Sequence, residues 1–165
     1  MKQLFLLRHA KSSWEDSSLS DIERPLNKRG KRDAPFMANL FKQKEISVDA
    51  IYSSHALRAL KTAEIFSKEL HIKKENIVIE EKIYEAGIKE LCDIVNNIPE
   101  TYSSVMIVGH NPGLTSFANF LGNKFIDNIP TCGIVGIEFR LKKWKEIERD
   151  TGEIFLFEYP KKYLK

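Results

Sequence analysis

The sequence predicts an α/β fold, with a mostly parallel central sheet of about six strands between two layers of helices (α/β/α). Short apolar segments alternate along the chain with longer segments of helical periodicity, the order typical of this class. Some apolar runs show no polar alternation, as expected for strands that are buried on both faces. The 165 residues, 42% of them hydrophobic, suffice for one domain over 1–165 with a sizeable core.

Six apolar segments are predicted as strands. They are Gln3–Leu7, Asp49–Ser53, Ile77–Glu80, Ser104–Gly109, Gly133–Arg140 and Ile154–Tyr159. The continuous runs Leu4–Leu7 and Val105–Val108 favour strands buried on both faces. Because only a short polar stretch separates the last two segments, we expect them to add an antiparallel edge to the sheet.

Four segments with helical periodicity lie between these strands. The first runs from about Asn27 to Lys42, with Asn27 as a plausible N-cap and Pro35 as a possible kink or local break. The second, Ala56–Leu70, repeats apolar residues at three- and four-residue steps. Shorter helices are predicted over Glu90–Asn96 and Gly113–Leu121.

Composition excludes several classes of protein. No apolar run reaches the roughly 18–20 residues that span a bilayer, and the first run ends too soon, at Arg8, to be a signal peptide. Two cysteines, Cys92 and Cys132, cannot form a disulfide framework or a four-ligand zinc site. The formal net charge of +3 is too small to indicate nucleic-acid binding. We therefore expect a cytoplasmic protein with no membrane or nucleic-acid partner.

Chemically active residues follow three of the predicted strands. Arg8 and His9 follow the first, Arg58 lies in the first turns of the helix after the second, and His110 lies in the turn Gly109–Gly113 after the fourth. In open parallel sheets, ligands bind beyond the carboxyl ends of the strands. These four side chains are therefore predicted to converge at one edge of the sheet.

Such a set of side chains suits phosphoryl chemistry. Arginine guanidinium groups match phosphate oxygens bidentately. A neutral imidazole nitrogen can attack phosphorus, and neighbouring arginines disfavour protonation of His9. His110 could donate a hydrogen bond to an equatorial oxygen, where charge spreads in the transition state. This chemistry requires no metal or other cofactor.

These residues also carry a family resemblance. The matching stretches are Leu6–Trp14 (LLRHAKSSW), Glu23–Gly30 (ERPLNKRG), Tyr52–Ala63 (YSSHALRALKTA) and Val108–Gly113 (VGHNPG). In this order they resemble the histidine phosphatase superfamily, the phosphoglycerate mutase-like or R-H-G group, and within it the SixA-type phosphohistidine phosphatases. Ala10 departs from the glycine of the R-H-G triplet, as is familiar in the SixA-like branch. The resemblance implies a phosphoglycerate mutase-like fold.

The resemblance also implies roles for particular residues. His9 would be the phosphorylated nucleophile, with Arg8, Arg58 and His110 forming the phosphate pocket around it. Ser12 aligns with a hydroxyl position near that pocket.

Two more polar side chains are candidates for substrate binding. Asn111 lies in the turn beside His110. Arg24, like Arg29, could reach the phosphate or could instead hold the loop by ion pairs, since Asp21 and Asn27 lie nearby in the sequence, and the second role is favoured.

A general acid is the least defined part of the predicted site. Larger relatives place a carboxylic acid after the third strand, and here Glu85 is the first candidate, with Glu81 behind it. Glu85 could equally be an ordinary loop or capping residue.

The predicted activity is removal of phosphate from phosphohistidine on a protein, such as a phosphorelay domain or a phosphotransferase-system carrier. The imidazole leaving group departs easily, so it depends little on a well-placed acid. One alternative is a small-molecule phosphomonoesterase that uses the same pocket. A third reading is a non-catalytic phosphate-binding module, although binding alone would have no use for a nucleophile. A monomer or weak dimer is expected.

Overall fold

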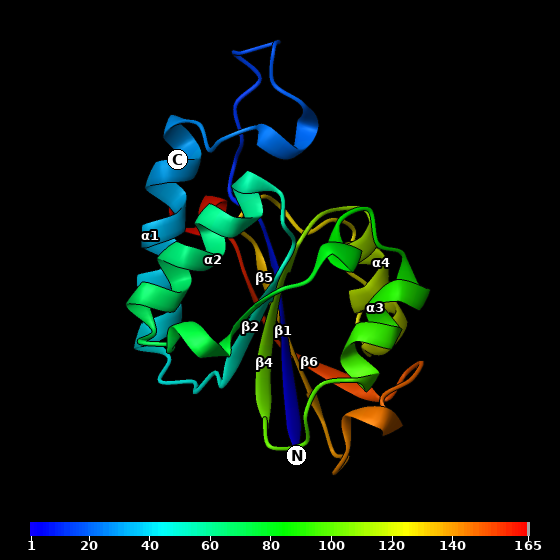
Figure 1. Cartoon of the computed structure of the whole chain (residues 1–165). Coiled ribbons are helices and arrows are strands. Elements are labelled where there is room, and N and C mark those ends of the chain that lie inside the picture. The colour runs from blue at the N-terminus through cyan, green and yellow to red at the C-terminus, as the bar shows by residue number, and fades with distance from the viewer. Residues whose placement is uncertain (165) are drawn as a thin grey trace.

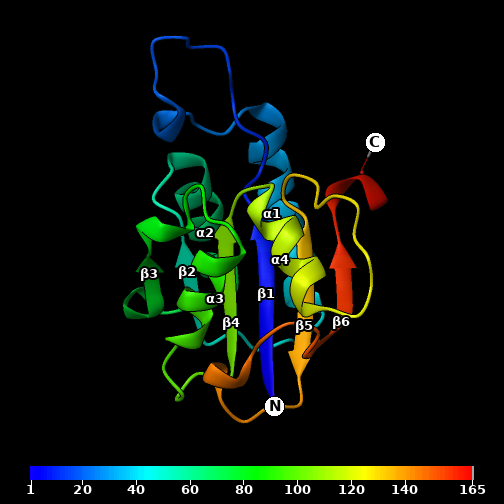
Figure 2. The ribbon, with the colours of Figure 1, turned by 90° about the vertical axis from the view of Figure 1, so that its right-hand side faces the viewer.

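A six-stranded mixed sheet runs through the centre of the computed structural model, which describes residues 1–164. The strands are β1 (Lys2–Arg8), β2 (Ala50–Ser53), β3 (Ile77–Ile79), β4 (Ser104–Gly109), β5 (Ile134–Phe139) and β6 (Gly152–Glu158). Their order in the sheet is β3-β2-β4-β1-β5-β6, as Figure 2 shows. The first four are parallel, whereas β5 is antiparallel to both of its neighbours. The mostly parallel sheet and the antiparallel pairing of the last two strands are both as predicted.

Helices cover both faces of this sheet. α1 (Lys28–Gln43) and α2 (Leu57–Glu69) lie on one face, and α3 (Ile88–Asn96) and α4 (Gly113–Leu121) lie on the other, as Figure 1 shows. None of these helices within residues 1–164 is long and apolar enough to cross a membrane. The arrangement confirms the three-layer α/β/α prediction.

The position of β1 inside the sheet explains why its apolar run is continuous. Side chains alternate between the two faces of a strand, and here both faces are covered. Leu4 and Leu6 belong to the core beneath α3 and α4, whereas Phe5 and Leu7 belong to the core beneath α1 and α2. A strand at this position in the sheet therefore has no polar face.

The predicted start of α1 is confirmed, but the predicted break within it is wrong. The Asn27 side-chain oxygen accepts a hydrogen bond from Gly30 N at 2.9 Å, which is the N-cap geometry. The helix then continues through Pro35 as far as Gln43. Pro35 is exposed, so water can satisfy the carbonyl that loses its helical partner there.

The registers of β1, β2 and β4 position the functional residues. Arg8 is paired with Gly109, and Ser53 is paired with Val108, so the three strands end at nearly the same level. The segments that follow these strands therefore emerge side by side. The chain between β1 and α1 projects outward from this same end of the sheet (Figure 2).

Candidate active site

The backbone of Arg8 and His9 is held on both sides by neighbouring strands. His9 N donates to the carbonyl of Gly109 at the end of β4, at 3.1 Å. On the other side, Arg8 N donates to the carbonyl of Gly133 at 3.0 Å, and Cys132 N reaches the carbonyls of both Arg8 and His9 at 3.0 Å. The dipeptide thus has little freedom to move relative to the sheet.

The His9 ring is buried in its neutral form, with one nitrogen already committed. Its Nδ1 lies 2.7 Å from the carbonyl oxygen of Ala10. Because a carbonyl can only accept, Nδ1 carries the proton and Nε2 keeps its lone pair. Burial, reinforced by the charges of Arg58 and Arg8 and by His110, lowers the pKa of His9 to about 3 despite the opposing Ala10 bond. At neutral pH the ring is therefore uncharged, with its Nε2 lone pair unprotonated.

His110 lies directly against His9. The two ring centroids are 5.2 Å apart, and His110 Nε2 lies 2.7 Å from the hydroxyl oxygen of Ser54. Its Nδ1 is buried and has no hydrogen-bond partner within residues 1–164. Burial, followed by the positive charge of Arg58, lowers the pKa of His110 to about 4. Ser54 is a residue of this site that the sequence analysis missed.

Arg58 is oriented by Asp21, which comes from the loop between β1 and α1. Two nitrogens of the buried Arg58 guanidinium donate to Asp21, Nη1 to the main-chain carbonyl at 2.6 Å and Nη2 to Oδ2 at 2.9 Å. The Tyr84 hydroxyl donates to the same Oδ2 at 2.5 Å. These bonds, that of Tyr84 above all, hold the pKa of the Asp21 carboxyl well below its usual range. Asp21 is therefore ionised and acts as a positioning residue rather than as a proton donor.

A cavity of about 420 Å³ opens beside this network. It is lined by Asp21, Arg58, Tyr84, Glu85, Ala86, Gly87, His110, Asn111, Pro112 and Gly113. The segments after β2, β3 and β4 and the loop after β1 all contribute to it. The structure thus brings Arg58, His110, Asn111 and Glu85 around one space, whereas His9 and Arg8, which were predicted to share a pocket with them, do not line this cavity.

Glu85 occupies an unusual backbone position on the rim of this cavity. Its φ of 59° lies in the left-handed region, which costs an L-residue roughly 1–2 kcal/mol. The side chain is exposed, and its carboxyl makes no side-chain hydrogen bond within residues 1–164. Ala86, the next residue, packs closely against Gly113, because a Cβ on Gly113 would lie 2.2 Å from the carbonyl oxygen of Ala86. The first turn of α4 therefore supports the loop that presents Glu85.

Arg8 lies near the two histidines but lines a different hollow. Its Nη1 donates to the carbonyl of Ile129 at 3.0 Å, and its Nε is buried without a partner within residues 1–164. The side chain borders a second pocket, on the α1 side, rather than the 420 Å³ cavity. It is close enough to His9 for its charge to lower that histidine's pKa. Arg8 thus lines the second pocket while its charge still acts on His9.

Ser12 and Arg24 are joined to each other rather than open to a ligand. Both are buried, and Arg24 Nη2 donates to the Ser12 hydroxyl. The other two guanidinium nitrogens donate to the Ser13 carbonyl at 3.1 Å and to Asp21 Oδ1 at 2.8 Å. The guanidinium also lies over the Trp14 ring, 3.2 Å from its centroid. These contacts favour the loop-holding role for Arg24, through its ion pair with Asp21.

Asn111 lines the cavity, but its side chain is occupied by protein contacts. Its amide nitrogen donates to the carbonyl of Ile129 at 2.9 Å and to Asn128 at 3.0 Å. Its oxygen accepts from the Thr115 hydroxyl at 2.8 Å. These bonds fasten the turn that carries His110 to the segment before β5. Within residues 1–164, no group of three or more His, Cys, Asp and Glu side chains is placed to hold a metal ion.

The profile of the histidine phosphatase superfamily (branch 1) matches residues 4–106, which include Arg8, His9 and Arg58. The chain belongs to this superfamily. A structure proposed to be the phosphohistidine phosphatase SixA from Agrobacterium tumefaciens matches this fold with a TM-score of 0.79 and 26% identity, over 96% of this chain and 98% of that chain. A tungstate complex of the protein histidine phosphatase SixA matches with a TM-score of 0.78 and 20% identity, over 97% and 98%.

A chloroplastic protein of Arabidopsis thaliana, itself uncharacterised, is 29% identical over 153 residues, which is 88% of this chain and 70% of the relative. The fold of this histidine phosphatase superfamily member is phosphoglycerate mutase-like and of the SixA type. The protein is a phosphatase of this superfamily.

Proposed function

We propose that this phosphatase removes the phosphoryl group from phosphohistidine on a protein, through a covalent intermediate on His9. The observation that carries the proposal is the state of the His9 ring. It is neutral, its Nδ1 proton is bound to the Ala10 carbonyl, and its Nε2 lone pair is left for attack. Arg58 and His110 lie beside it, and both face the 420 Å³ cavity.

The reaction proceeds in two steps. In the first, His9 Nε2 forms a bond to phosphorus while the bond from phosphorus to the substrate nitrogen breaks, and the departing imidazole takes up a proton from solvent. In the second, water attacks the phosphoryl group on His9 and releases inorganic phosphate, which restores the neutral ring. Arg8, Arg58 and His110 stabilise the charge that spreads over the phosphoryl oxygens in both steps.

The tautomer of His110 follows from the same reasoning. If the Ser54 hydroxyl donates to His110 Nε2, the proton of the neutral ring is on Nδ1. That nitrogen is buried without a partner, so it can donate to a phosphoryl oxygen when the substrate arrives. Ser54 then acts as a positioning residue that selects the donating form of His110.

The leaving group supports phosphohistidine as the substrate. An imidazole nitrogen is readily protonated near neutral pH and departs without a strongly held acid. Glu85 is exposed on the rim, and no side-chain hydrogen bond within residues 1–164 holds its carboxyl. The likeness to SixA proteins over nearly the whole chain points the same way. A cytoplasmic location and a monomeric or weakly dimeric state remain predictions.

A small-molecule phosphomonoesterase is the second candidate, and the position of Glu85 favours it. An alkoxide leaving group needs a general acid, and Glu85 lines the same cavity as Arg58 and His110. A carboxylic acid on that rim could protonate the oxygen of a sugar phosphate that enters the cavity.

Steady-state kinetics separate the two candidates. A phosphohistidine peptide and free phosphoramidate are compared with a panel of sugar phosphates at equal concentration. We expect the phosphoramidates to have the higher kcat/KM, and efficient turnover of sugar phosphates with slow phosphoramidate cleavage would reverse the assignment. Rapid quenching without acid, followed by mass spectrometry, should find the phosphoryl group on His9. His9→Ala should abolish hydrolysis, whereas a parent protein without measurable hydrolysis would indicate a binding module.

A further inference from the structure

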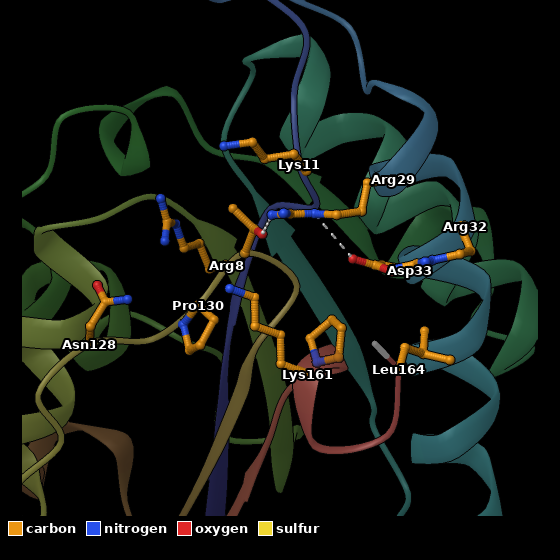
Figure 3. Close-up of a pocket in the computed structure, with 11 residues that line it drawn as sticks. Arg8, Lys11, Arg29, Arg32, Asp33, Asn128, Pro130, Lys161 and Leu164 are labelled. Carbon is orange, nitrogen blue, oxygen red and sulfur yellow. Dashed lines mark hydrogen bonds and ion pairs between the residues drawn. The ribbon is translucent and has the colours of Figure 1, made fainter.

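A second pocket, of about 240 Å³, lies on the α1 side of the active site. Four segments line it: the end of β1, the first turns of α1, the loop before β5, and the C-terminal 3-10 helix Pro160–Lys162. The described lining residues are Arg8, Lys11, Arg29, Arg32, Asp33, Asn128, Pro130, Thr131, Pro160, Lys161 and Leu164. Figure 3 shows the charged ends of Lys11, Arg29 and Lys161 pointing toward the side on which Arg8 lies.

The charge of this pocket is strongly one-sided. Its described lining includes five cations (Arg8, Lys11, Arg29, Arg32 and Lys161), and the acidic residue among them is Asp33. The buried Asp33 carboxylate lies 2.9 Å from Arg32 and 3.8 Å from Arg29, so much of its charge is already compensated. A concave surface lined by cations concentrates field and attracts anions.

Several of these cations have donors that are free for a ligand. Arg29 donates one nitrogen to the Thr131 hydroxyl at 3.2 Å and turns another toward Asp33, which leaves its third guanidinium nitrogen for a ligand. Lys161 is exposed, and within residues 1–164 its ammonium makes no salt bridge. Pro130 and Leu164 supply apolar wall. An anion placed here could therefore meet charged donors from α1 and from the C-terminal helix at once.

Arg8 connects this pocket to the reaction centre. Arg8 lines the pocket, and its charge acts on His9, the next residue in the chain. The unpartnered, buried Arg8 Nε leaves donor capacity beyond the bond to Ile129. A substrate held at His9 would therefore have its neighbouring groups within reach of this pocket.

We propose that the pocket binds carboxylate side chains that flank the phosphohistidine of a protein substrate. This proposal rests on the proposed function and adds a preference for substrates with an acidic surface around the modified histidine. Carboxylates pair bidentately with arginine, and the spread of cations over several segments matches a run of acidic side chains. The same chemistry would also accept the second phosphate of a bisphosphorylated small molecule, which the experiment tests as a separate source.

The test uses two phosphohistidine peptides of equal length, one with Asp and Glu flanking the phosphohistidine and one with Asn and Gln in their place. The parent protein is compared with Lys161→Gln, Lys161→Glu and Arg29→Gln. A matched control, Lys142→Gln with Lys145→Gln, removes exposed charge at the opposite end of the sheet, near the 3-10 helix Trp144–Glu146 (Figure 1). Free phosphoramidate reports on the reaction centre alone.

We expect the parent to prefer the acidic peptide by about tenfold in kcat/KM at low salt, and Lys161→Glu to remove most of that preference. The control variant and phosphoramidate turnover should change by less than about twofold, within the effect of an ordinary surface substitution. An equal preference in Lys161→Glu and parent would overturn the proposal. A bisphosphorylated sugar that is favoured over its monophosphate in a Lys161-dependent way, with no preference between the peptides, would also overturn it.

A binding measurement keeps this test independent of the proposed function. The acidic peptide without its phosphoryl group is titrated into each protein by isothermal titration calorimetry. Weaker binding to Lys161→Glu and Arg29→Gln than to the parent and the control supports the pocket even if the phosphohistidine peptides are not hydrolysed. No measurable binding to the parent, or equal binding to all variants, counts against it.

Discussion

Lowering the pH from 7 to 5 is expected to destabilise the folded protein through its two buried histidines. In the unfolded chain each imidazole titrates near its ordinary pKa of roughly 6.5. In the folded protein the pKa of His9 is lowered to about 3 and that of His110 to about 4. Between about pH 4 and 6.5, the unfolded state therefore binds more protons than the folded state does, and the free energy of unfolding falls as the pH falls.

The size of the effect follows from these values. Each histidine that stays neutral in the fold should cost roughly 2 kcal/mol of unfolding free energy between pH 7 and pH 5, or about 4 kcal/mol for the pair. Carboxyl groups titrate mostly below this window, so they contribute little to it. For a domain with a total stability of roughly 5–15 kcal/mol, this loss is easily measured.

The assay is urea unfolding followed by circular dichroism at pH 7 and pH 5. His9→Asn and His110→Asn should each remove about half of the pH dependence, whatever they do to stability at pH 7. The matched control is His71→Asn, because His71 is exposed and its left-handed backbone, with φ of 57°, tolerates asparagine. The reasoning fails if the double variant His9→Asn/His110→Asn keeps the full loss of stability between the two pH values.

Three further predictions concern the site and its support. Ser54→Ala should lower kcat about tenfold with a smaller change in KM, because His110 loses the partner that selects its donating tautomer. Steady-state kinetics with phosphoramidate would show this, and an unchanged kcat would argue against the positioning role of Ser54. Glu85→Gln should slow hydrolysis of an alkyl phosphate about a hundredfold but leave phosphoramidate cleavage within about threefold, and equal losses on both substrates would contradict the leaving-group argument. Gly30→Ala should destabilise the protein by about 1–3 kcal/mol or more, because the added Cβ would lie 2.2 Å from the carbonyl oxygen of Lys11. The melting temperature and the activity should fall together. A variant with the parent's melting temperature would refute the close approach.

Some features of the site could not be predicted because no local sequence pattern indicates them. Asp21 begins a short 3-10 helix, Asp21–Glu23, in the segment between β1 and α1, and it meets Arg58 only because that segment folds back onto the first turn of α2. Ser54 follows β2 like many polar residues at strand ends, and only the packing of β4 beside β2 brings His110 to it. The division of the basic residues between two pockets, with Arg58 in one and Arg8 in the other, likewise depends on how α1 and the C-terminal 3-10 helix pack on the sheet.

The amino-acid sequence alone determined the fold class and which side chains lie near His9. Uninterrupted apolar runs predict buried parallel strands, and the carboxyl ends of such strands necessarily share an edge, which is why Arg8, His9, Arg58 and His110 could be placed together. Tertiary structure alone decided which groups surround His9 and His110, and therefore that both pKa values are lowered. Both rings are buried, and their partners are distant in the chain, such as the charges around His9 and the hydroxyl beside His110. The local sequence shows neither the burial nor these partners.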